Sequence, residues 1–271
     1  MLQDDRNSPG DTPATLPPLL SAEEAPAVEI VNPEGQSPVV LVCEHAGARV
    51  PSALRSLGLP AEVFGRHIAV DLGAEGLARR LAARLDAVLV LQRYSRLVVD
   101  CNRPLEARDC IPEVSDAVVI PGNAGLGEAE RRRRYDALHL AFHEAVTRVM
   151  DRRCDRPTLF VAIHSFTRRL AGDTTDRPWQ IGLLFNRDPR LAERLMTALH
   201  ILRPGLSAAF NQPYAVCDGG DYTIPVHGEG RGVPHVLIEV RNDEIATKEG
   251  QDAWAGLLAA ALNDALGQGS F

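Results

Sequence analysis

Six short aliphatic runs alternate with longer amphipathic patterns along this chain, and the alternation limits the folds available to it. The runs occupy residues 38–43, 87–91, 96–100, 158–163, 180–185 and 235–240. Several are apolar at successive positions, which is typical of strands covered on both faces. Helical periodicity appears at residues 77–85, 135–149, 191–202 and 254–262. The pattern predicts an α/β fold, a three-layer αβα sandwich around a mixed, largely parallel sheet.

We expect one domain that follows a disordered tail. Residues 1–25 are rich in Pro, Ser, Thr, Asp and Glu, and this composition buries too little surface to offset the entropy of ordering. Residues 26–271 contain no linker-like stretch, internal repeat or low-complexity segment. The sequence therefore predicts a tail over 1–25 and a single domain over 26–271.

Charge and composition argue against several classes of partner. A net charge of -7 over 271 residues gives no general attraction to nucleic acid or to an anionic membrane. No apolar stretch approaches the roughly 20 residues that cross a bilayer, and the first residues lack the pattern of a signal peptide. The five cysteines contain no CxxC pair, which argues against a disulfide framework and a thiolate zinc site. We therefore expect a cytoplasmic protein with small-molecule partners, and its oligomeric state stays open.

Polar side chains follow four of the predicted strands. They are Glu44 and His45, then Asp100, Asn102 and Arg103, then His164 and Ser165, and finally Glu239 and Arg241. In open α/β sheets, ligands bind beyond the carboxyl ends of the strands. We therefore expect these side chains at one edge of the sheet, beside a ligand site.

Two of these side chains, His45 and His164, indicate a metal centre. Neutral imidazoles that converge with carboxylates are the usual ligands of a catalytic zinc ion, which takes three protein ligands and leaves one position open for water. A carboxylate such as Glu239 can then act as a base. In the alternative, each histidine is hydrogen-bonded inside the structure or exposed near a loop.

Asp71 has two possible roles. It precedes a predicted helix, where its carboxylate could interact with the free N–H groups of the first turn, or it could bind the metal. No HExxH, HxxE or DxH motif decides between these roles.

Arginines near the same strand ends indicate an anionic small-molecule substrate. They are Arg96, Arg103 with its neighbour Asn102, and Arg241. Arg241 follows Glu239 by two residues, so the two share one face of an extended strand. A guanidinium grips a carboxylate through two hydrogen bonds. In the alternative, Asp100 and Glu239 pair with these arginines inside the protein.

A glycine-rich stretch over 219–232 is a candidate substrate loop or lid. It carries Tyr222, His227 and Arg231, but no phosphate-loop motif. Loops of this kind often contribute binding residues or close over a substrate. An ordinary turn-rich connection is the alternative.

Nucleophilic catalysis is the competing chemistry. Ser165 follows His164, but the surrounding residues lack the Gly-x-Ser-x-Gly turn of a nucleophile elbow. No cysteine is adjacent in sequence to a histidine that could activate it. The residues therefore favour a metal-dependent site.

Six sequence blocks carry a resemblance to a known family. They are CEHAGARVP (43–51), AVDLGAEGLA (69–78), YSRLVVDCNRP (94–104), IHSFT (163–167), RPWQIGLLFN (177–186) and IEVRND (238–243). In this order they resemble the N-formylglutamate amidohydrolases, in the branch that carries CEHAG. That family is similar to the zinc carboxypeptidases, so the resemblance implies their α/β sandwich around a mixed sheet.

The resemblance also implies roles for single residues. His45 and His164 match ligands of one zinc ion, and Glu239 matches the general base. Asn102 and Arg103 match the pair that holds a substrate carboxylate.

The sequence departs from the peptidases at their HxxE motif, because Ala48 stands where the glutamate would be. The carboxylate ligand must then come from elsewhere. We choose Asp71, which lies in one of the family's blocks, with Glu44 as the alternative.

The implied reaction is the hydrolysis of N-formyl-L-glutamate to formate and glutamate, a step of histidine degradation. Another N-acyl amino acid or small amide is the alternative substrate. A third hypothesis is a homologue that binds a small molecule without catalysis. The presence of His45, His164 and Glu239 together argues against it.

Overall fold

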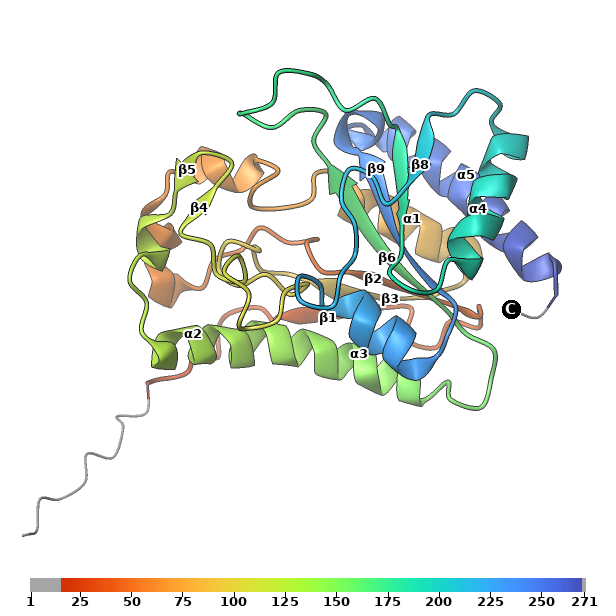
Figure 1. Ribbon diagram of the computed structural model, residues 1–271. Helices are drawn as coiled ribbons and strands as arrows, with labels where there is room; N and C mark the ends of the chain where they lie inside the picture. Colours follow the sequence, from red (N-terminus) through yellow and green to blue (C-terminus); the bar gives the residue numbers. More distant parts are fainter. Residues whose placement is uncertain (1–15, 270–271) are drawn as a thin grey trace, which may run out of the picture.

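The computed structural model describes residues 16–269 and contains one seven-stranded mixed sheet (Figure 1). The strand order is β1-β3-β2-β6-β9-β7-β8. The strands span Val28–Val31 (β1), Val39–Cys43 (β2), Val88–Gln92 (β3), Leu159–Phe166 (β6), Ile181–Leu184 (β7), Ala208–Phe210 (β8) and His235–Arg241 (β9). The central strands β3, β2, β6 and β9 are parallel to one another. Strand β1 is antiparallel to β3, and β7 is antiparallel to β9.

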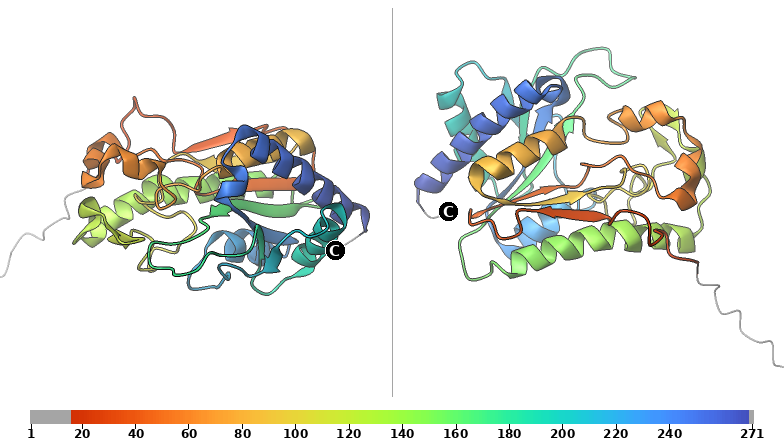
Figure 2. Two further views of the ribbon diagram at one scale, coloured as in Figure 1. Left: turned by 90° about the horizontal axis from the view of Figure 1, so that it is seen from above. Right: turned by 180° about the vertical axis from the view of Figure 1, so that it is seen from behind.

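Helices cover both faces of this sheet, which confirms the predicted three-layer α/β architecture. The α-helices span Ala74–Leu85 (α1), Glu128–Arg134 (α2), Ala141–Asp151 (α3), Arg190–Leu202 (α4) and Lys248–Gly267 (α5). Helices α1, α4 and α5 pack on one face, and α3, the end of the long helical segment that begins with α2, packs on the other (Figure 2). A π-helical segment, Tyr135–Leu140, joins α2 to α3.

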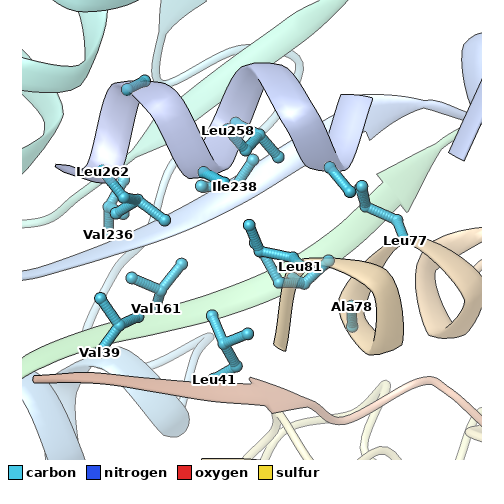
Figure 3. Packing of buried hydrophobic residues seen from close by; sticks show 14 of the residues in the cluster. Val39, Leu41, Leu77, Ala78, Leu81, Val161, Val236, Ile238, Leu258 and Leu262 are labelled. Carbon is cyan, nitrogen blue, oxygen red and sulfur yellow. The ribbon is translucent and has the colours of Figure 1, made fainter. Parts of the chain in front are cut away.

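Strand β2 shows why its sequence is apolar at every position. Val39 and Leu41 point into the cluster with α1 and α5, where Figure 3 shows Leu41 below Leu81 and Val39 beside Val161. Val40 and Val42 point into the opposite cluster, with α3. Because both faces of the strand are covered, neither tolerates a polar side chain.

A third apolar cluster lies beside the sheet and draws mainly on the segments between β2 and α1 and between β3 and α2. Short helical turns at Ser52–Gly58 (η1), Ala61–Gly65 (η2) and Pro121–Asn123 (η3) belong to this region, together with a small hairpin of β4 (Val114–Ser115) and β5 (Val118–Val119). Further turns at Ile224–Gly228 (η5), Glu229–Arg231 (η6) and Asn242–Ile245 (η7) flank β9.

The predicted strand over 96–100 is wrong. This segment forms a turn in which the N–H of Val98 donates to the carbonyl of Ser95 at 2.9 Å. Leu97, Val98 and Val99 are buried in the third cluster, so the run is apolar because of packing outside the sheet. Strands β1 and β8 have no predicted counterpart, since these short edge strands are only partly buried and lack a continuous apolar run.

Part of the predicted disordered tail is packed against the domain. Leu19 is buried in the third cluster, and the carbonyl of Ala25 accepts a hydrogen bond from the Tyr94 hydroxyl at 2.8 Å. Residues 1–15 of that tail lie outside the described residues. Within residues 16–269, no helix combines the length and the apolar character needed to cross a membrane.

Candidate metal centre and substrate cleft

Three neighbouring strands bring the predicted chemical groups to one edge of the sheet. His45 follows β2 by two residues, while His164 and Glu239 lie near the ends of β6 and β9. His164 and Glu239 are directly paired in the register of these two strands. Asp71 comes from the segment before α1, and its N–H donates to the carbonyl of His45 at 3.0 Å. Backbone hydrogen bonds thus fix the positions from which all four side chains project.

His45, Asp71 and His164 form a buried cluster in which one possible ligand atom of each residue lies within 4.8 Å of the others. Oδ2 of Asp71 is 2.9 Å from Nδ1 of His164 and 3.4 Å from Nδ1 of His45. At most 4% of each residue is exposed. The structure therefore brings together the three ligands that we chose from the sequence.

These three residues fit a catalytic metal ion. Nδ1 of His45 is buried and has no hydrogen-bond partner among the described residues, so a bound cation would satisfy it. Two imidazoles and one carboxylate are also a donor set that catalytic zinc sites use. The alternative of internally satisfied histidines does not account for this nitrogen.

Two further carboxylates contact the far sides of the histidine rings. Oδ1 of Asp100 is 2.7 Å from Nε2 of His45, and Oε2 of Glu44 is 3.0 Å from Nε2 of His164. Carboxylates in this position fix the tautomer and the orientation of ligating histidines. Glu44 therefore lies behind His164 and outside the three-residue cluster, which favours Asp71 as the carboxylate ligand.

Glu239 lies in the cavity wall and is 7% exposed. Burial and the negative charge of Asp71, opposed by His164 and Arg96, together raise the pKa of its carboxyl group to about 7. Its Oε2 atom has no hydrogen-bond partner among residues 16–269. A carboxyl group with a pKa near neutrality can both accept and return a proton.

Arg96 is also in the cavity wall, but its guanidinium is engaged by the protein itself. Nε and Nη2 donate to Oδ2 of Asp100 at 3.0 and 2.6 Å, and Nη1 lies 3.3 Å from Oδ1 of Asp71. Burial works against the charge of Arg96, yet these two carboxylates raise its pKa above the usual value. Arg96 therefore pairs with carboxylates inside the protein, which is the alternative that we considered for the arginines.

Asn102 and Arg103 line the same cavity but hold a neighbouring loop. The Asn102 amide oxygen accepts from the N–H groups of Tyr222 and Thr223, and its Nδ2 donates to Asp221 at 3.0 Å. The Arg103 guanidinium contacts Asp109 and Asp221 and donates to the carbonyl of Gly220. Nη2 of Arg103 has no partner among the described residues, so this arginine keeps one donor for a ligand.

The remaining residues predicted to bind substrate lie away from the cavity. Arg241 pairs with Asp243 and Glu244 and donates to the carbonyl of Trp179. Tyr222, which is partly buried, and His227 belong to a separate group of rings with the buried His139 and His143.

In that group, Nδ1 of His143 lies 3.0 Å from Nε2 of His227. Burial lowers the pKa of His143 to about 4 and that of His227 to about 3, which keeps both imidazoles neutral at pH 7. The 219–232 stretch therefore directs the His227 ring into the protein interior, against His143 of α3, instead of into the cavity.

The cavity has a volume of about 340 Å³ and opens beside the metal cluster. Loops complete its wall with residues that sequence analysis missed, among them His67, Asp116, Tyr214 and Asp221. None of these residues follows a predicted strand or stands in a known short motif, so only the three-dimensional structure reveals them.

Comparisons with known proteins agree with this arrangement. The family model for N-formylglutamate amidohydrolase matches residues 37–246. A solved structure of a gene product from Agrobacterium tumefaciens is 39% identical, covers 92% of this chain and 98% of its own, and superposes with a TM-score of 0.87. An N-formylglutamate amidohydrolase from Ralstonia eutropha shares the fold at 17% identity, with a TM-score of 0.58 over 89% of this chain and 98% of that chain.

No curated protein matches the chain. The segment matched by the family model includes the metal cluster, Glu239 and every strand of the sheet except β1. The chain belongs to the N-formylglutamate amidohydrolase family.

Proposed function

We propose that this protein is a zinc-dependent amidohydrolase that hydrolyses N-formyl-L-glutamate to formate and glutamate. The observation that carries the proposal is one cavity that contains the His45, Asp71 and His164 cluster together with the carboxyl group of Glu239. Family membership supports the reaction class.

His45, Asp71 and His164 would hold one zinc ion. When bound, zinc supplies a water of lowered pKa and polarises the carbonyl oxygen of the scissile amide. Asp100 and Glu44 orient the two imidazoles from behind. Arg96 keeps Asp71 and Asp100 charged and in place.

Glu239 accepts a proton from the attacking water and returns it to the leaving nitrogen, which needs a carboxyl group able to exist in both states near pH 7. The products are a carboxylic acid and a free amine. Arg103 directs Nη2 at a substrate carboxylate, in keeping with an anionic substrate.

Within this proposal, the partner is a small N-acyl amino acid, and neither nucleic acid nor a membrane is a partner. The reaction takes place in the cytoplasm and belongs to histidine degradation. One amidohydrolase domain carries all the groups that the reaction uses.

A formate-release assay across N-formyl amino acids tests the proposal. We expect zinc-loaded protein to hydrolyse N-formyl-L-glutamate with a kcat/KM at least tenfold above that for N-formyl-L-alanine, since a second carboxylate adds about 1.4 kcal/mol or more of binding. Chelation of the zinc should abolish formate release. Equal turnover of the two substrates would reject the glutamate specificity, and full activity without metal would reject the zinc mechanism.

A further inference from the structure

Most side-chain hydrogen-bond donors in the cavity wall already donate to acceptors within the protein. The Arg96 guanidinium is engaged by Asp71 and Asp100. The hydroxyl of Ser165 donates to the carbonyl of Leu72 at 2.9 Å, and that of Thr167 donates to the carbonyl of Arg169 at 3.2 Å. A substrate carboxylate therefore finds few free donors on this wall.

The Asn102 amide shows the problem most clearly. Its oxygen accepts from the 222–223 backbone and one N–H of its nitrogen donates to Asp221, so at most one N–H is left to accompany Arg103 at a substrate carboxylate. Nη2 is the one nitrogen of Arg103 that is free among the described residues, and a second donor at the other carboxylate oxygen would strengthen the binding of a substrate carboxylate.

Tyr214 supplies a donor at the right place. It lines the cavity from the loop after β8, and 44% of the residue is exposed. Its hydroxyl accepts a hydrogen bond of 2.9 Å from Nη1 of Arg177. Within residues 16–269 this hydroxyl has no acceptor for its own hydrogen.

Arg177 holds this tyrosine from behind. The guanidinium carbon lies 5.0 Å from the centre of the Tyr214 ring, and Nη1 also donates to the carbonyl of Thr167 at 3.3 Å. Thr167 directly follows β6, the strand that carries His164. Arg177 thus connects the Tyr214 loop to the rigid sheet edge.

The electrostatic surroundings keep the hydroxyl protonated. Burial raises the pKa of Tyr214 above its usual value of 10.0, against the effect of Arg177, and the charge of Glu239 raises it further. A hydroxyl that accepts from a guanidinium is also polarised, so it becomes a stronger donor toward a third group.

We propose that Tyr214 donates a hydrogen bond to a carboxylate of the amino-acid part of the substrate, and that Arg177 is its positioning residue. This inference rests on the proposed amidohydrolase function. The metal cluster and Glu239 are almost fully buried, whereas Tyr214 is partly exposed at the cavity wall. With the formyl group at the buried cluster, the amino-acid part of the substrate would extend to the more exposed part of the cavity wall, to which Tyr214 belongs.

Calorimetric titration of the zinc-loaded full chain tests this contact. Glu239→Gln is used as the parent, so that N-formyl-L-glutamate binds without turnover. Adding Tyr214→Phe should raise the Kd for this ligand about tenfold or more, as expected for a lost hydrogen bond to a charged group. Tyr94→Phe removes a hydroxyl that contacts Ala25 outside the cavity, and it should leave the Kd unchanged.

The two monoamides of N-formyl-L-glutamate identify the carboxylate. The amide that lacks the contacted carboxylate should bind equally well to the parent and to Tyr214→Phe, whereas the other amide should keep the full effect. An unchanged Kd for the acid, the same loss for all three ligands, or no binding of any of them to the parent would overturn the inference.

The role of Arg177 is tested by a double-mutant cycle. Arg177→Met should raise the Kd for N-formyl-L-glutamate severalfold in the presence of Tyr214 and should have no further effect in Tyr214→Phe. Additive losses would show that Arg177 acts independently and would overturn its positioning role.

These outcomes are distinct from those of the proposed reaction. Wild-type protein that binds N-formyl-L-glutamate through Tyr214 but releases no formate would contradict the proposed function alone. Wild-type protein that releases formate, with an unchanged KM in Tyr214→Phe, would contradict the Tyr214 contact alone.

Discussion

In the cluster of His45, Asp71 and His164, the role of each nearby carboxylate depends on which imidazole nitrogen it contacts. Asp71 lies between Nδ1 of His45 and Nδ1 of His164, whereas Asp100 and Glu44 contact the opposite nitrogens. Two acidic residues that are equally buried thus have different expected roles. We expect Asp71 to share a metal ion with the histidines, and Glu44 only to hold one of them in place.

Substitution of Asp71 and Glu44 should separate these roles. Asp71→Asn should lose stoichiometric zinc, because it removes the only carboxylate in the cluster. Glu44→Gln should keep one zinc ion and bind it about 10- to 100-fold more weakly. Chelator competition measures both affinities. The opposite order, with zinc retained in Asp71→Asn and lost in Glu44→Gln, would contradict the assignment.

At the residue scale, the sequence predicts the metal cluster and misses much of the substrate wall. His45, His164 and Glu239 are recognisable because each ends an apolar strand, and family blocks add Asp71. Tyr214 has no such signal, because its position depends on a loop and on the contact with Arg177. Loop conformation depends on long-range packing, which a pattern of residue types does not encode locally.

At the scale of elements, the site depends on how the chain leaves β2. Gly47 follows His45 by two residues and passes close to the backbone of Arg93, just after β3. A Cβ atom at position 47 would lie 2.0 Å from the carbonyl oxygen of Arg93. Only glycine permits this approach, so it sets the path of the segment that carries the first histidine.

Gly47→Ala should destabilise the fold by about 1–3 kcal/mol, because the backbone must shift to relieve the overlap. The shift should also lower kcat/KM, since a small displacement of His45 misplaces the metal. Urea unfolding and formate release measure the two effects. Gly65→Ala, where a Cβ meets nothing within 4 Å, is the matched control. Equal stability of both variants would contradict the prediction.

The strand predictions are correct where the apolar run is buried inside the sheet. Central strands such as β2 and β6 are covered on both faces, and their sequences show it. The run over 96–100 has the same appearance but packs into the third cluster as a turn. An apolar pattern indicates that a segment is buried. It does not show whether the segment is buried inside a sheet or against other parts of the protein.

At the scale of the whole molecule, a buried group of neutral histidines makes stability depend on pH. His143 and His227 are almost fully buried, and their pKa values are lowered to about 4 and about 3. The unfolded chain has histidines with a pKa near 6.5, so it binds more protons than the folded chain between pH 6.5 and 4. The contribution of these two histidines to stability is therefore greatest above pH 6.5, and it falls as the pH drops through this window.

His143→Gln should show this linkage. The variant loses a hydrogen bond at pH 7, but the stability gap to the wild type should shrink by about 1.4 kcal/mol per pH unit between pH 6.5 and 4.5. Urea unfolding of the two proteins across this range measures the gap. His200→Gln, on the exposed surface of α4, is the control. A gap that stays constant with pH would show that His143 does not titrate in this window.

The parallel pairing of β2, β6 and β9 has a consequence for how this enzyme family can diversify. His45, His164 and Glu239 lie in or just after these three strands, which are paired as one continuous ladder. Tyr214 and the other loop residues of the cavity wall are anchored separately, through contacts such as the one with Arg177. Loop replacement can therefore change which amide is accepted while the hydrolytic machinery stays intact, which makes these loops the natural target for engineering a new substrate range.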